Sequence, residues 1–157
     1  MTSVKTLSQE SARHVSADHE WLMERLAELD SCLESILYFG EVCGDMRGFA
    51  GLRQRCEEVY QFLSRHIPEE EAAFERLREE RCEVSALLDT LISEHRGLLK
   101  ELKSCLATLD TLESGALIPE DLFKLEDRLD KVVEGLKAHI RSENKLVLPL
   151  MGVGEPT

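Results

Sequence analysis

The spacing of apolar residues along four long segments constrains the fold of this chain more than any other feature. In each segment the apolar positions recur at alternating steps of three and four residues, which places them on one stripe of an α-helix. The four stripes run over residues 12–36, 52–77, 84–112 and 122–150. The last of them ends with Leu146 and Leu150. Four helices that each carry one apolar stripe can bury it only against one another, which favours a helix bundle.

Turn-forming residues separate the four segments. Three glycines between residues 40 and 48 mark the first break, a weaker break lies around 81–83, and the third falls at 114–119, where Pro119 suits the first position of a helix. Short connections between long helices favour antiparallel neighbours. A chain of 157 residues can bury such a core without disulfides. We therefore predict an all-α, antiparallel up-down-up-down four-helix bundle that forms one domain over residues 1–157, with the bundle at about 8–150 and a tail at 151–157.

Six ionisable residues interrupt the apolar stripes. Every segment contributes one histidine, and the second and fourth segments each add a glutamate four residues later. The six residues are His19, His66, Glu70, His95, His139 and Glu143. An i to i+4 spacing puts a histidine and its glutamate on one helix face. Counting from the breaks puts the four histidines within roughly 5 Å of one another along the bundle axis.

These six groups need partners if they are buried. Two unpaired buried carboxylates would be strongly unfavourable or would stay protonated, and the imidazole nitrogens would also need partners. A pair of divalent cations removes both problems, and imidazole with carboxylate suits iron, manganese, zinc or copper. One such histidine alone is more often a satisfied core residue, and Glu70 alone, between Glu69 and Glu71, could be a surface residue. The set of six at one depth favours a metal site.

Two further residues lie close to this set. Pro68, between His66 and Glu70, removes one helical hydrogen bond. It either kinks the second helix or begins a new one whose acidic first turn contains the glutamates that follow. His14, five residues before His19, points away from the stripe and is predicted to lie on the surface.

Four stretches of sequence together resemble the bacterial hemerythrin-like, or HHE cation-binding, domains. They are DHEWL around His19, HIPEEEAAF from His66, SEHRGLL around His95 and HIRSENKLVLPL from His139, and the resemblance spans about residues 8–150. The resemblance implies two non-haem iron ions, joined by an oxo or hydroxo bridge, that bind or react with dioxygen, nitric oxide or hydrogen peroxide. It further implies that one iron is held by His19 and His66, the other by His95 and His139, and that Glu70 and Glu143 bridge the two.

The chain departs from the oxygen-carrying members of that family at two points. The carriers have a second histidine on the third helix, four residues from the first, where this chain has Leu91 and Leu99. Their last carboxylate follows its histidine by five residues, whereas Glu143 follows His139 by four. One nitrogen ligand is thus missing, which leaves more open coordination. The set of four histidines and two glutamates is more similar to proteins implicated in repairing nitrosatively damaged iron–sulfur centres.

Three functions stay open at this point. The chain could bind a gas or a peroxide for sensing, storage or detoxification. It could be a redox enzyme or an iron donor for the repair of damaged iron–sulfur clusters. It could also be a metal-free helical interaction module. The sequence leaves open both the enzyme question and the oligomeric state.

Charge and cysteine content bear on partners and compartment. A formal net charge of -12 disfavours binding to nucleic acid or to an anionic membrane. No apolar stretch approaches the ~20 residues of a membrane span, and the first residues lack the pattern of a signal peptide. Five cysteines without a C-x-x-C spacing are typical of a reducing compartment. We therefore expect a cytoplasmic protein whose partner is a small molecule.

Overall fold

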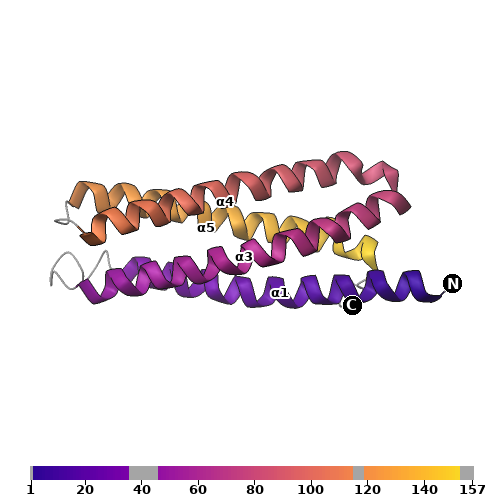
Figure 1. Cartoon of the computed structure of the whole chain (residues 1–157), viewed down its shortest axis with the longest axis horizontal. Coiled ribbons are helices and arrows are strands. Elements are labelled where there is room, and N and C mark those ends of the chain that lie inside the picture. Colours follow the sequence, from indigo (N-terminus) through magenta and orange to yellow (C-terminus); the bar gives the residue numbers. More distant parts are fainter. Residues whose placement is uncertain (1, 36–45, 115–118, 153–157) are drawn as a thin grey trace.

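Four long helices make up most of the computed structural model, which describes residues 2–35, 46–114 and 119–152. The helices are α1 (Thr2–Ser35), α3 (Met46–Glu80), α4 (Ser85–Ser114) and α5 (Pro119–Leu146), with two short 3-10 turns, η2 (Cys82–Val84) and η3 (Leu148–Met151). They lie side by side along one long axis (Figure 1), and each of α1 and α4 packs against both α3 and α5. The predicted all-α four-helix bundle is confirmed.

The breaks between the helices agree with the sequence where the structure describes them. The second break is confirmed, because α3 ends at Glu80 and η2 connects it to α4. Pro119 begins α5, as its fixed backbone angle predicts. The first break falls mainly on residues 36–45, which lie outside the described residues, and Gly48 belongs to α3. In the described ranges no helix combines the length and apolarity of a membrane span.

The described stripe positions form the core as two apolar clusters, one on each side of the ionisable layer. The larger cluster contains Leu26, Leu129 and their neighbours, and the smaller one contains Phe74 and Leu88. These four named side chains are at most 1% exposed. The ionisable residues therefore lie in the middle of a long hydrophobic interior, between two apolar clusters that exclude water.

The end of the fourth stripe differs from its prediction. Leu146 is 45% exposed, and Leu150 is only partly buried. The reason is that α5 stops at Leu146 and the chain turns into η3, so the helical period no longer applies. Leu148 and Met151 of η3 fill the core instead, at 5% exposure each. The other stripe positions Ile36, Leu112 and Leu122 lie outside the residues whose side chains are described.

Pro68 does not divide the second helix. Helix α3 runs without a break from Met46 to Glu80, with the proline inside it. The interpretation in which a new helix begins at Pro68 is therefore wrong. The proline lacks the N–H that would bond to the carbonyl of Ser64, and the Ser64 hydroxyl donates to the Tyr60 carbonyl at 2.8 Å.

Candidate metal centre

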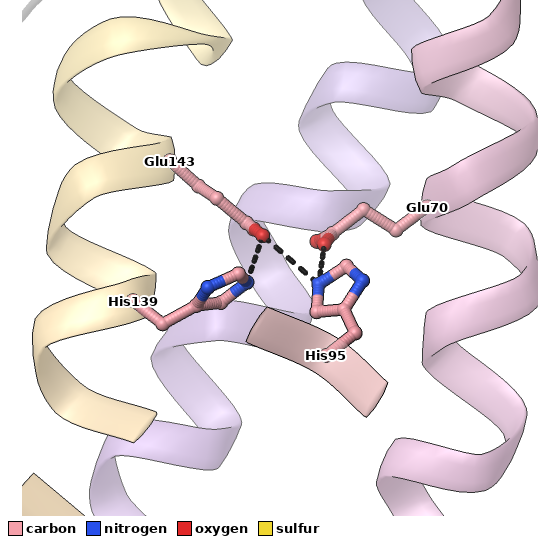
Figure 2. Close-up of side chains that lie close together, drawn as sticks. All are labelled: Glu70, His95, His139 and Glu143. Atoms are coloured by element: carbon pink, nitrogen blue, oxygen red, sulfur yellow. Dashed lines mark hydrogen bonds and ion pairs between the residues drawn. The ribbon is translucent and has the colours of Figure 1, made fainter. Parts of the chain in front are cut away.

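The structure brings all six ionisable stripe residues together in one buried layer. Their exposed fractions lie between 1% and 6%. Helix α1 provides His19, α3 provides His66 and Glu70, α4 provides His95, and α5 provides His139 and Glu143. Four of them are drawn in Figure 2, which shows the two carboxylates pointing toward each other from α3 and α5, next to the rings of His95 and His139.

The two carboxylates occupy the middle of the layer, and the imidazole Nε2 atoms surround them. Glu70 oxygens lie 2.9 Å from Nε2 of His19, 2.8 Å from that of His66 and 2.8 Å from that of His95. Glu143 oxygens lie 3.0 Å from Nε2 of His19 and 3.1 Å from that of His95, and Glu143 also contacts Nε2 of His139. Each histidine thus directs the same ring nitrogen toward a shared carboxylate.

The donor atoms form two overlapping groups, each compact enough to hold a metal ion. One group consists of His19, His66 and Glu70, and the other of Glu70, His95, His139 and Glu143. Within each group the candidate ligand atoms all lie within 4.8 Å of one another. Glu70 belongs to both groups, so its carboxylate is placed to contact two ions.

Buried atoms without well-formed hydrogen bonds indicate that a cation fits here. Glu70 Oε1, His139 Nε2 and Glu143 Oε2 are buried and lie close to other groups of the layer, but none of the three makes a hydrogen bond of suitable geometry to a described residue. Buried polar atoms without partners are unfavourable unless something else binds them. Two donors that bind one transition-metal ion at ~2.1 Å and near right angles lie about 3 Å apart, which is close to the nitrogen–oxygen separations in this layer. The residues present therefore fit a transition-metal cation.

The opposite ring nitrogen of each of the four buried histidines has its own acceptor, and the sequence analysis missed all four of these outer partners. Nδ1 donates to Asn144 at 2.7 Å from His19, to Asp18 at 2.8 Å from His66, to Glu71 at 3.4 Å from His95 and to Glu94 at 2.9 Å from His139. A proton fixed on Nδ1 leaves the Nε2 lone pair for a metal. The outer partners therefore select the ring tautomer and orientation that a metal ligand needs.

The outer partners follow a pattern that was present in the sequence. Asp18 and Glu94 directly precede His19 and His95, and Glu71 and Asn144 directly follow Glu70 and Glu143. Each of them serves the histidine on the next helix, in the closed order α1 to α3, α3 to α4, α4 to α5 and α5 to α1. A polar acceptor directly adjacent in sequence to four of the six predicted ligands was the available signal.

In the metal-free state the carboxylates hold protons on the imidazoles. Burial lowers the pKa of His19, but its contacts with Glu143 and Glu70 outweigh burial and raise this pKa to about 10. The same opposition of burial and the two carboxylates raises the pKa of His95 to about 10. Burial alone would raise the pKa of Glu70, yet its contacts with the histidines hold it well below the usual range. Protons thus neutralise the layer when no cation does.

Metal uptake by the metal-free chain is therefore expected to release protons near neutral pH. His19 and His95 are protonated there because their pKa is about 10, and a cation needs the Nε2 lone pairs. The stability that these protons give the metal-free fold is complete below the ordinary pKa of 6.5 and is lost as the pH rises through about 10. An indicator dye in weakly buffered, anaerobic solution measures the released acid during iron(II) titration. A further addition to loaded protein is the control, and uptake without acid release would contradict the expectation.

Comparison with known families agrees with this geometry. The model of the hemerythrin HHE cation binding domain matches residues 11–151. The chain belongs to this family. No curated protein and no solved structure matches the chain. The family predicted from the four sequence stretches is thus confirmed, and this hemerythrin HHE domain is a cation-binding domain whose six predicted ligand residues lie in one cluster.

Residues around the cluster complete the comparison with the sequence. The positions four residues from His95, where oxygen carriers place another histidine, hold Leu91, which is 2% exposed, and Leu99, which is partly buried. His14 is exposed, as predicted, and its Nε2 lies 3.1 Å from Glu69. This hemerythrin HHE domain therefore offers four imidazoles and two carboxylates at its centre.

Proposed function

We propose that this chain is a non-haem di-iron protein that binds or reacts with dioxygen, nitric oxide or peroxide. The observation that carries the proposal is the pair of overlapping donor groups, which share Glu70 and leave three buried polar atoms without hydrogen bonds. Two cations would satisfy these atoms and balance both carboxylates. When bound, a pair of iron ions would supply redox electrons and open coordination positions for such small molecules.

Each of the two proposed ions would be held by its own pair of histidines. His19 and His66 would hold one ion, and His95 and His139 the other, with the carboxylates of Glu70 and Glu143 between them. This division follows the two donor groups. The outer partners would keep each Nε2 directed inward, so that the imidazoles are oriented before a cation arrives.

Apolar side chains would isolate the centre from bulk water. Leu22, Leu63, Leu91 and Ile140 are between 1% and 3% exposed, and Leu98 is partly buried. They belong to the apolar clusters on both sides of the layer. A small uncharged molecule can pass such side chains more readily than a hydrated ion, so these residues would slow the loss of iron and favour small ligands.

Metal analysis with spectroscopy tests the proposal. Chain purified after growth in iron is expected to contain about two iron atoms, as in other di-iron carboxylate bundles, and to absorb in the near ultraviolet. The spectrum of the anaerobically reduced protein should change when dioxygen or nitric oxide is added. Iron content near zero would contradict the proposal and leave the metal-free interaction module as the better reading.

Kinetics with peroxide separate the two metal-dependent functions. Stopped-flow mixing that gives one stable spectral change indicates a binder used for sensing, storage or detoxification. Many turnovers with excess peroxide indicate a redox enzyme. Transfer of iron to an apo iron–sulfur protein, with loss of the spectrum, indicates an iron donor for cluster repair.

We also propose that the protein is cytoplasmic and forms a single domain. The described cysteines, Cys32, Cys56, Cys82 and Cys105, are all free thiols, which suits a reducing compartment. Cys43 lies outside the described residues. The long helices share one continuous side-by-side arrangement (Figure 1), which supports a single folding unit over the bundle.

A further inference from the structure

The candidate centre has an internal twofold repeat. The repeat aligns Asp18–His19 with Glu94–His95, and His66–Glu70 with His139–Glu143. It also aligns Glu71 with Asn144, which are the outer partners of His95 and His19. The pair α1 and α3 is therefore equivalent to the pair α4 and α5, and any difference between the two pairs is a feature of this particular chain.

The first pair closes its outer face with aromatic rings. Trp21 of α1 stacks on Phe62 of α3, with ring centroids 4.4 Å apart. Phe62 in turn stacks on the ring of His66 at 5.6 Å. The guanidinium groups of Arg25 and Arg65 lie over Trp21 and Phe62. These rings cover His66 on the side of the bundle that faces solvent.

The second pair has glycines at the same two positions. Gly97 of α4 aligns with the tryptophan, and Gly135 of α5 aligns with the phenylalanine. A groove of about 660 Å³ opens there between α4 and α5, and His139 lies along it. The groove on the equivalent aromatic face does not reach His66. Of these two equivalent grooves, only the one between α4 and α5 is lined by a candidate ligand, His139.

Neither glycine is required by backbone packing between the helices. A Cβ on Gly135 would lie 2.9 Å from Cδ2 of Leu98, which is the end of a flexible side chain and would have to shift. A Cβ on Gly97 would meet nothing within 4 Å. Glycine is unfavourable inside a helix compared with any residue except proline. The consequence of Gly97 is an open groove, not a tighter bundle.

The groove changes character along its length. His139 and Glu94 lie at the level of the candidate centre, Leu98 and Val132 form an apolar middle, and a group of basic residues follows. The basic residues are Lys100, Arg128 and Lys131. Because helices rise ~1.5 Å per residue, the level of Lys131 is about 12 Å from that of His139.

One of the basic residues has no partner of its own. Lys131 lies 3.0 Å from Asp127, and Arg128 lies 4.0 Å from Glu101. Lys100, in contrast, pairs with no carboxylate among the described residues. The three cations outnumber the two carboxylates beside them, Glu101 and Asp127, so in a chain with a formal net charge of -12 this end of the groove is a local positive site. A bound anion would neutralise this positive site.

We propose that this groove binds a medium-chain aliphatic carboxylate. The carboxylate lies against Lys100, Arg128 and Lys131, the chain lies over Leu98 and Val132, and its far end points toward His139. The volume is that of a small-molecule site, which is typically about 300–1,000 Å³, and is far larger than a diatomic gas needs. The proposal concerns a second ligand site, and it holds whether or not the buried layer contains iron.

Calorimetric titration of the full chain with octanoate tests the proposal. Octanoate is expected to bind at one site, octanol at least about tenfold more weakly because it lacks the charge, and acetate not measurably because it lacks the chain. Equal affinities for octanoate and octanol would overturn the proposed carboxylate recognition. No binding of octanoate to the wild-type chain would overturn the proposal as a whole.

Two substitutions with matched controls locate the site. Gly97→Leu places a side chain in the groove, at a position where a Cβ meets nothing within 4 Å, and should weaken octanoate binding at least about tenfold, whereas Gly97→Ala should have a smaller effect. Lys100→Glu should weaken it at least about fivefold. Lys103→Glu, which changes an exposed lysine of α4 outside the groove, should leave it unchanged.

Each outcome of the substitutions has a defined meaning. Unchanged binding in Gly97→Leu, with native helix content by circular dichroism, would place octanoate elsewhere and overturn the proposal. If Gly97→Leu does not fold, equal effects of Lys100→Glu and Lys103→Glu would overturn it instead. Iron analysis of the same samples separates this site from the proposed function, because a chain that binds octanoate but no iron contradicts only the di-iron centre.

Discussion

Glu70→Ala is expected to remove nearly all bound iron from the chain. The Glu70 carboxylate lies within 2.9 Å of Nε2 of His19, His66 and His95 and belongs to both donor groups. Its loss therefore affects both proposed ions at once. Loss of an outer partner alone typically weakens metal binding 10- to 100-fold, so loss of a shared ligand should weaken it by at least about 100-fold. Iron analysis after equilibration with a competing chelator measures the effect.

The neighbouring residue provides the control. Glu69→Gln removes a carboxylate at the adjacent position, but this side chain is exposed and lies 3.1 Å from Nε2 of His14, outside the buried layer. This variant should keep the wild-type iron content. Glu70→Gln preserves the shape of the side chain. It therefore separates the loss of a metal ligand from a loss of folding in the alanine variant. Wild-type iron in both Glu70 variants would show that the buried carboxylate is not a ligand.

Leu129→Ala is expected to lower the free energy of unfolding by about 2–5 kcal/mol. Leu129 is 0% exposed and lies in the larger apolar cluster. The substitution leaves a cavity that a rigid four-helix core fills only in part. Urea unfolding of metal-free samples, followed by circular dichroism, measures the difference from the wild-type chain.

The same substitution at a leucine of the same helix is the comparison. Leu146 is 45% exposed at the end of α5, so Leu146→Ala should change the free energy of unfolding by no more than about 0.5 kcal/mol. The fourth apolar stripe of the sequence treats the two leucines as equivalent. Equal destabilisation by both substitutions would mean that α5 continues its inward stripe to Leu146 and that the described end of the bundle is wrong.

The bundle could be predicted because its main signal is local. Steps of three and four residues report which side of one helix is buried, and no knowledge of the neighbouring helices is needed. The same local signal placed His66 with Glu70 and His139 with Glu143 on shared faces. The convergence of six such groups followed from counting residues to the breaks between helices. That these six residues bind metal ions stays a prediction.

The outer partners of the histidines and the groove could not be predicted, because they depend on how neighbouring helices are rotated relative to one another. Asp18 and Glu94 resemble ordinary charged residues of a solvated face, and only the orientation of α3 and α5 shows that they accept hydrogen bonds from His66 and His139. The groove could not be predicted for the same reason, because Gly97 and Gly135 are far apart in sequence. Leu146 was misassigned because periodicity does not indicate where a helix stops.

The closed order of outer partners links the two helical hairpins, which are α1 with α3 and α4 with α5. Each hairpin needs the other to orient one of its histidine rings. Asp18 and Glu94 act within their own hairpins, but Glu71 orients a ring of the second hairpin, and Asn144 orients a ring of the first. Neither hairpin alone can direct both of its imidazoles. Separation of the hairpins and escape of a bound cation should therefore be a single event, and the rate of escape would report how often the bundle opens.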